Sequence, residues 1–326
     1  KDECLLSGYD PVDLCSGNFI SEQEDLKIGG AYPVVFRRFY NALDKNAGKD
    51  NEDKCNDIGR GWCHNFSMHL TRTDDDDIKI SYPDGSIGTY VRKDGKKLHF
   101  DEAEFEPEVW VEKHGEPGEL TVYADGYKVT TDYNIYTAFD QNGYLIAMGD
   151  GGKGEKLSVC YEEVETEIKT GQRDRRIAMV KARSGAFIRF TYNTENQISS
   201  VTDHTGRTVS YRYTQDGCLS EICLADGSVR RYTYDSNGRI IQTQNESGVI
   251  SIQNQYDEQG RITAQIYPNQ GRMSFDYDDK KRSCVATERN GNKVTYFHDA
   301  LGRHAGTRYY DGEEKFRYNK RNQKIS

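Results

Sequence analysis

The sequence predicts an all-β protein built from an array of antiparallel β-hairpins. Its composition favours sheet, because 23 Tyr, 12 Phe and 31 Gly stand against only 4 Met and 6 Pro. From about residue 185 onward, a pattern of two turns and two strands returns every ~21 residues. No segment shows a sustained helical period with caps. These three observations together indicate hairpins laid side by side.

Each copy of the pattern opens with a turn centred on Gly, and an alternating segment follows. The turns are Ser184-Gly185, Thr205-Gly206, Asp226-Gly227, Ser247-Gly248, Gln270-Gly271, Asn290-Gly291 and Asp311-Gly312. In the segment after Thr205-Gly206, Val209, Tyr211 and Tyr213 alternate with polar residues. A period of two predicts a strand with one aromatic and one polar face.

A second turn follows each alternating strand and begins with Tyr, or with His298 in one copy. Asp or Asn can bond its own backbone in such a turn, and Gly accepts a positive φ. The residues that define this part of the repeat are Tyr192, Tyr213, Tyr234, Asp235, Gly238, Arg239, Tyr256, Asp257, Gly260, Arg261, Tyr277, Asp278, Arg282, Asp299, Gly302, Arg303 and Tyr318. A short apolar strand follows most copies, such as Ile262 to Ile266.

One hairpin alone is marginal in water, so neighbouring units are expected to pair along their edges and bury a shared aromatic face. The Tyr rings would then follow one another at the ~4.8 Å spacing of strands. Arg239, Arg261, Arg282 and Arg303 would form a second row beside Asp235, Asp257, Asp278 and Asp299. We interpret these rows as contacts that hold neighbouring repeats in register rather than as a ligand surface.

The Tyr-Asp-x-x-Gly-Arg units at 234–239 and 256–261 resemble the YD repeats of bacterial Rhs proteins, insecticidal toxin-complex shells and teneurins. The amino-terminal part is similar to the segment that precedes YD repeats in Rhs and wall-associated proteins. The matching pieces are Asp10-Pro11-Val12-Asp13, Ser16-Gly17-Asn18-Phe19, Asp25-Leu26, Arg37-Arg38-Phe39-Tyr40-Asn41, Gly59-Arg60-Gly61-Trp62 and His64-Asn65-Phe66. The resemblance implies a β-spiral shell that encloses a carboxy-terminal toxin, or an extracellular adhesive barrel.

Three regions are expected. Residues 1–72 form a leader segment, residues 73–176 form irregular hairpin units with a charged excursion at 153–176, and residues 177–326 form the YD repeats. The last copy stops after its turn, and the chain begins at Lys1 without Met. We therefore expect a longer protein whose remaining repeats and toxin domain are the partners of this part. The resemblance implies a secreted or cell-surface location, and no signal peptide is visible.

The net charge of −9, from 44 basic and 53 acidic residues spread along the chain, argues against nucleic acid as a partner. No stretch approaches the ~20 apolar residues that cross a bilayer. The eight cysteines contain no Cys-x-x-Cys pair. Free, strand-buried thiols are favoured over a disulfide framework, with a Cys55–Cys63 disulfide as the alternative.

Two clusters could bind metal. Asp74 to Asp77 offer oxygen ligands for calcium but lack the spaced pattern of a calcium loop, so a solvated turn is favoured. Cys55, Cys63, His64 and His69 offer zinc donors, but their spacing matches no known ribbon or finger. No nucleophile elbow, phosphate loop or metalloprotease motif is present. We therefore predict no cofactor, no metal and no enzyme.

The function expected is a non-catalytic scaffold that encloses or presents a toxin. The alternative is a cell-surface adhesion or carbohydrate-binding module, in which exposed Tyr rings stack on sugars. Unpaired strand edges favour self-association, so we expect either concentration-dependent oligomers or a cap supplied by residues 1–72.

Overall fold

The computed structural model describes residues 12–30, 32–43, 57–93, 108–113, 118–131, 133–164, 175–268, 270–319 and 324–325. Every regular element among these residues is a β-strand, and the strands run from β1 to β27. The all-β hairpin array predicted from the sequence is therefore confirmed. The cysteines Cys4 and Cys55, the loop at 44–56 and the tip of the charged excursion at 165–174 lie outside the described residues.

The leader segment forms its own four-stranded sheet in the order β1-β2-β3-β4. Its strands are β1 (Val12–Asp13), β2 (Asn18–Ile28), β3 (Val34–Asn41) and β4 (Trp62–His64). A strict alternation of buried and half-buried residues along β3 gives this sheet one packed face. We refer to β1–β4 as the leader sheet.

A second, much longer sheet contains all the remaining strands, and each pairs antiparallel with the next one along the chain. The early strands are β5 (His69–Arg72), β6 (Ile78–Ser81), β7 (Ile87–Arg92), β8 (Glu108–Glu112), β9 (Glu119–Tyr123), β10 (Gly126–Thr130), β11 (Ile135–Asp140), β12 (Leu145–Asp150), β13 (Glu155–Glu163) and β14 (Arg175–Ala182). The strand β5 lies within the segment assigned to the leader by sequence but pairs with β6.

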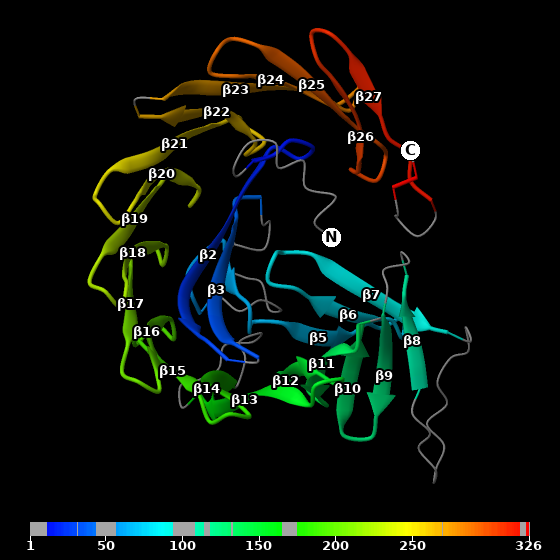
Figure 1. Ribbon diagram of the computed structural model, residues 1–326, viewed down its shortest axis with the longest axis vertical. Helices are drawn as coiled ribbons and strands as arrows, with labels where there is room; N and C mark the ends of the chain where they lie inside the picture. Colours follow the sequence, from blue (N-terminus) through cyan, green and yellow to red (C-terminus); the bar gives the residue numbers. More distant parts are fainter. Residues whose placement is uncertain are drawn as a thin grey trace.

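The YD repeats supply the rest of this sheet. Their strands are β15 (Phe187–Tyr192), β16 (Ile198–Asp203), β17 (Thr208–Tyr213), β18 (Leu219–Cys223), β19 (Val229–Tyr234), β20 (Ile240–Gln244), β21 (Ile250–Tyr256), β22 (Ile262–Tyr267), β23 (Gly271–Asp278), β24 (Ser283–Thr287), β25 (Lys293–His298), β26 (His304–Arg308) and β27 (Glu313–Lys315). Figure 1 shows that they form a curved wall, with β2 and β3 lying inside the curve.

The repeat unit is one hairpin whose first strand ends on the tyrosine. Tyr234 at the end of β19 pairs with Ile240 at the start of β20, and a bulge follows, because Thr233 pairs with Gln242. The same shift recurs between β21 and β22. Consecutive tyrosine strands are separated by a return strand, so the rings lie two strand spacings apart. The predicted ~4.8 Å ring spacing is therefore wrong.

Part of the hydrophobic core lies between the leader sheet and the inner face of the curved wall, and the same cluster continues through β6 to β12. The ring of Phe36 lies 5.4 Å from that of Phe190 and 6.2 Å from that of Tyr211, and the ring of Trp62 lies 5.2 Å from that of Tyr232. The tyrosines Tyr192, Tyr213, Tyr234, Tyr256 and Tyr277 pack against this core. A single apolar layer thus joins segments that are far apart in sequence.

Candidate functional site: the YD ladder

In the turns that follow Tyr234 and Tyr256, the aspartate after the tyrosine closes the turn. In the turn at 235–239, Asp235 Oδ1 accepts hydrogen bonds from the backbone N–H of Asn237 (2.9 Å) and Arg239 (2.9 Å). Gly238 adopts φ +77°, a conformation that glycine reaches without strain. The N–H of Gly238 donates to the carbonyl of Asp235 at 3.0 Å. This is a type I turn followed by a left-handed residue, a common three-residue hairpin loop.

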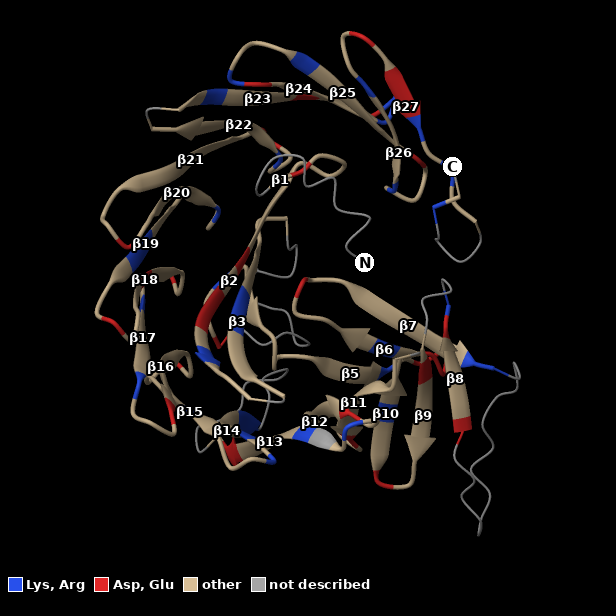
Figure 2. Cartoon of the chain, in the orientation of Figure 1, with Lys and Arg blue, Asp and Glu red and all other residues tan. Residues whose placement is uncertain are grey.

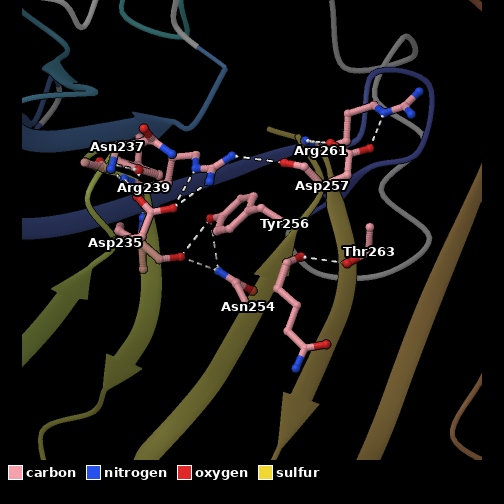
Figure 3. A network of polar contacts seen from close by, with 12 residues as sticks. Asp235, Asn237, Arg239, Asn254, Tyr256, Asp257, Arg261 and Thr263 are labelled. Atoms are coloured by element: carbon pink, nitrogen blue, oxygen red, sulfur yellow. Dashed lines mark hydrogen bonds and ion pairs between the residues drawn. The ribbon is translucent and has the colours of Figure 1, made fainter. Parts of the chain in front are cut away.

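The arginine of the turn binds the same aspartate through its side chain. Arg239 Nε donates to Asp235 Oδ2 at 2.8 Å, and its Nη2 lies 2.7 Å from the same oxygen. Arg261 with Asp257, and Arg303 with Asp299, repeat this pair four residues apart. Figure 3 shows two successive turns with their arginines and the tyrosine Tyr256 between them.

The arginine also contacts the tyrosine of the next unit. The guanidinium of Arg239 lies 4.6 Å from the ring centre of Tyr256, and that of Arg261 lies 4.7 Å from the ring centre of Tyr277. Arg303 is placed in the same way on Tyr318, at 4.6 Å. Each arginine therefore joins an ion pair within its own unit to a cation–π contact with the following one.

The tyrosine hydroxyl completes the link by donating to a backbone carbonyl of the preceding unit. Tyr256 donates to the carbonyl of Ile240 at 2.7 Å, and Tyr277 donates to that of Ile262 at 2.8 Å. The same bond is made by Tyr192 to Ile177, Tyr213 to Ile198, Tyr234 to Leu219 and Tyr318 to His304. We call the linked Tyr, Asp and Arg side chains of these turns the YD ladder.

Burial and ion pairing move the titration of these groups in opposite directions. Burial raises the pKa of Tyr256 and Tyr277 well above that of a free tyrosine. At Asp257 desolvation would raise the pKa, but hydrogen bonds from Arg261 outweigh it and lower the pKa. The ladder therefore holds neutral phenols beside charged Asp-Arg pairs at neutral pH.

Two positions of the predicted rows depart from this pattern. In the turn after Tyr277, Asp278 pairs with Lys281 at 2.8 Å instead of with Arg282, which adopts φ +49°. Tyr277 pairs with Cys284, so this turn is one residue longer and Arg282 takes the left-handed position that glycine holds elsewhere. In the next unit His298 replaces tyrosine, while Asp299 and Arg303 keep their ion pair.

Two members of the pattern escaped the sequence interpretation. Arg176 lies 4.5 Å from the ring centre of Tyr192 and immediately precedes Ile177, so the charged excursion ends in a ladder arginine. The turn at 203–207, at the opposite end of the hairpins, also reads Asp-x-x-Gly-Arg, and Arg207 Nε donates to Asp203 Oδ2 at 2.7 Å. Arg176 can be recognised in the sequence because it stands directly before an apolar return strand. The turn at 203–207 can be recognised from the Asp-x-x-Gly-Arg motif alone, without a preceding tyrosine.

The ladder arginine should tolerate lysine poorly, because lysine offers no planar group that can pair and stack together. We expect Arg239→Lys to lower the free energy of unfolding by about 1 kcal/mol, measured by urea denaturation. Arg212→Lys is the matched control. Arg212 pairs with Glu221 at 2.9 Å while its side chain is 78% exposed, so its change should be close to zero. Equal losses in the two variants would contradict a special role for the ladder.

The buried aspartate at 203 should make stability depend on pH in the acid range. Desolvation would raise the pKa of Asp203, but hydrogen bonds from Thr205 and Arg207 outweigh it and lower the pKa from 3.8 to about 2. A lowered folded-state pKa gives stability that is present above pH ~4 and is lost as pH falls toward ~2. Asp203→Asn should flatten this part of the stability curve. A carboxyl titration of Asp203 by NMR with a midpoint at or above 3.8 would contradict it.

The candidate metal ligands are engaged in other contacts. His64 Nε2 lies 3.1 Å from Asp57 Oδ2, and its Nδ1 accepts the N–H of Phe66 at 3.2 Å. The ring of His69 packs on that of Tyr144 at 5.3 Å. No group of three or more His, Cys, Asp or Glu placed to hold a metal ion occurs among the described residues. Cys160, Cys218, Cys223 and Cys284 are free thiols.

Two family models match this chain. The Teneurin YD-shell model covers residues 166–292, and a domain of unknown function, DUF6531, covers residues 9–100. The probable deoxyribonuclease RhsB of Dickeya dadantii is 23% identical over 353 residues, which span 91% of this chain and 24% of that protein. Together these matches support an Rhs/YD-repeat family for this chain. Most of the YD ladder, from Arg176 to Tyr277, lies within the residues that the Teneurin YD-shell model matches.

Further similarities are to parts of longer proteins. The tRNA nuclease WapA of Bacillus subtilis is 25% identical over 312 residues, spanning 88% of this chain and 11% of WapA. Among solved structures, the Photorhabdus luminescens Tc holotoxin pore is similar over 93% of this chain and 19% of that chain, with 10% identity and a TM-score of 0.41. This YD-repeat chain spans about a quarter or less of the length of these relatives. Its described residues include no helix that could cross a membrane.

Proposed function

We propose that this chain is a non-catalytic scaffold segment that forms part of the wall of a β-shell, which encloses or presents a toxin domain. The observation that carries the proposal is the way each ladder tyrosine bonds the unit before it. The hydroxyl of Tyr256 donates to Ile240 while Arg239 covers its ring, so adjacent hairpins are joined by side chains as well as by strand pairing. A wall built in this way extends unit by unit.

The partners proposed are the remainder of the same chain, namely further YD repeats and a toxin domain, and the location proposed is secreted or cell-surface. The names of RhsB and WapA describe nucleases, and this chain matches 24% and 11% of their lengths. We propose that nucleolytic activity in such a protein belongs to the part outside the matched region. The acidic net charge of −9 is consistent with a wall that does not hold nucleic acid itself.

The alternative, a carbohydrate-binding module, relied on tyrosine faces that are free to stack on sugars. One face of Tyr256 lies under Arg239, and its hydroxyl is bonded to Ile240. Tyr277 has the same arrangement with Arg261 and Ile262. The ladder tyrosines therefore lend no support to that alternative.

The test uses the full-length gene product and this chain side by side. The chain alone should cleave neither DNA nor tRNA, and in the full-length protein the toxin domain should resist protease. Arg239→Ala combined with Arg261→Ala should loosen the wall and speed digestion of that domain, while the exposed Arg212→Ala should not. Cleavage of nucleic acid by this chain, or equal digestion in all three proteins, would refute the scaffold.

A further inference from the structure

In three of the units, the residue that follows the YD turn is bonded on two sides. Its carbonyl accepts the tyrosine of the next unit, as described for Ile198, Ile240 and Ile262. Its N–H points to the leader segment instead of to the wall. Ile198 donates to the carbonyl of Asp57 (2.5 Å), Ile240 to the hydroxyl of Tyr40 (3.0 Å) and Ile262 to the carbonyl of Gly17 (2.8 Å).

These bonds arise because the bulge at the turn takes the residue out of the regular ladder of the hairpin. The shift occurs at Ile198, Ile240 and Ile262 alike. A buried N–H that lacks an acceptor is destabilising, so each of these positions requires a partner from elsewhere. The leader segment provides one at three units that are spread along the wall.

The unit between those of Ile198 and Ile240 contains Gly217 and Leu219, and it contacts the leader segment through backbone atoms. The N–H of Arg60 donates to the carbonyl of Gly217 at 3.3 Å. Gly59 adopts φ +97°, and a Cβ placed on it would lie 2.9 Å from the backbone nitrogen of Leu219. Only glycine permits this approach. The leader therefore touches four consecutive units, each at the same position of the repeat.

Arg60 also occupies the position of a ladder arginine that the repeats lack. The turn after Tyr213 has Cys218 where the turns after Tyr234 and Tyr256 have arginine. A Cβ on Gly238, in the next turn, would lie 3.2 Å from Arg60 Cζ. The corresponding Cβ on Gly260 would lie 3.3 Å from Arg239 Nη1. Arg60 of the leader segment thus supplies a guanidinium where the turn after Tyr213 has no arginine.

We propose that the leader segment is an internal template for the YD repeats. Each of its acceptors fits the inward N–H of one unit, so the leader fixes the order and curvature of the units from Ile198 to Ile262. The contacts join residues about 140 to 245 positions apart, as between Asp57 and Ile198 or Gly17 and Ile262. Template and units therefore fold as one cooperative body.

The first test removes one acceptor atom. Tyr40→Phe should speed hydrogen exchange of the Ile240 amide by about tenfold, because that N–H loses its partner. Tyr192→Phe is the matched control, since its hydroxyl donates to Ile177 and not to the leader. It should leave the Ile240 amide unchanged. Unchanged exchange at Ile240 in Tyr40→Phe, or equal acceleration in both variants, would overturn the template.

The second test blocks the close approach at another unit. Gly17 adopts φ +73°, and a Cβ there would lie 2.5 Å from Cβ of Arg261, so Gly17→Ala should speed exchange in peptides covering Ile262. Gly206 also has a positive φ, +92°, but faces open space, and Gly206→Ala should not affect those peptides. Equal exchange near Ile262 in the two variants would refute the proposal. If Gly17→Ala fails to fold, the Tyr40→Phe comparison still decides.

Discussion

Asp25→Ala is expected to lower the free energy of unfolding by about 3–5 kcal/mol, because it leaves a guanidinium buried without a counter-charge. The side chains of Asp25 and Arg38 are both fully buried (0% exposed) between the leader sheet and the wall. Arg38 Nη2 donates to Asp25 Oδ1 at 2.9 Å, its Nε donates to Oδ2, and Tyr211 donates to Oδ2 at 2.9 Å.

The buried arginine cannot relieve the loss by giving up its proton. Burial would lower the pKa of Arg38, but Asp25 outweighs it and raises the pKa further above the ordinary value. Arginine stays charged throughout the accessible pH range. Chemical denaturation of the variant should therefore show the same large loss at neutral and at mildly alkaline pH.

The neighbouring pair on the same two strands is the control. Figure 2 shows acidic stretches of β2 lying beside basic stretches of β3. Arg37 pairs with Glu22 at 3.1 Å, with both side chains about half exposed, so Glu22→Ala should cost ~0–1 kcal/mol. In addition, Asp25→Leu combined with Arg38→Met should be more stable than Asp25→Ala, because no charge is left buried. A loss under 1 kcal/mol in Asp25→Ala would contradict the argument.

The repeat part of this fold was accessible from sequence because its signals are local. The alternation around Tyr211 and the Asp-x-x-Gly-Arg turn at 235–239 each lie within about six residues, and their geometry depends on residues in the same hairpin. Of the two partners of each ladder arginine, the sequence predicted the aspartate but not the tyrosine. The pairing of Arg239 with Asp235 is local, whereas its contact with Tyr256 depends on the spacing of two hairpins.

Two kinds of feature could not be obtained from the pattern. One extra residue in the turn after Tyr277 moves Arg282 out of the arginine row, although Tyr277, Asp278 and Arg282 keep the spacing of the repeat. The position of the leader sheet inside the curved wall depends on contacts such as that between Tyr40 and Ile240, which are 200 residues apart. A single sequence carries no periodic signal for pairs that are so far apart. The leader motif could therefore be recognised by resemblance, but its packing inside the curved wall could not be predicted.

Trp62→Ala is expected to cost about 3–5 kcal/mol, as large truncations in a core do. Trp62 is 1% exposed, and its ring lies 5.0 Å from that of Tyr40 and 4.5 Å from the guanidinium of Arg38. Its Nε1–H donates to the hydroxyl of Tyr234 at 3.0 Å, so it joins the leader to the YD ladder. Trp62→Ala should therefore destabilise both the leader sheet and the YD repeats.

Trp62→Phe separates the packing from the hydrogen bond. It keeps an aromatic ring against Tyr40 and Arg38 but removes the donor to Tyr234, whose own hydroxyl still donates to Leu219 at 2.6 Å. We expect Trp62→Phe to cost about 1–2 kcal/mol, clearly less than Trp62→Ala. Thermal denaturation should show one cooperative transition for each variant, because leader and repeats share one core. Separate transitions, with the repeats melting at the wild-type temperature in Trp62→Ala, would mean that the leader packs on the wall without supporting it.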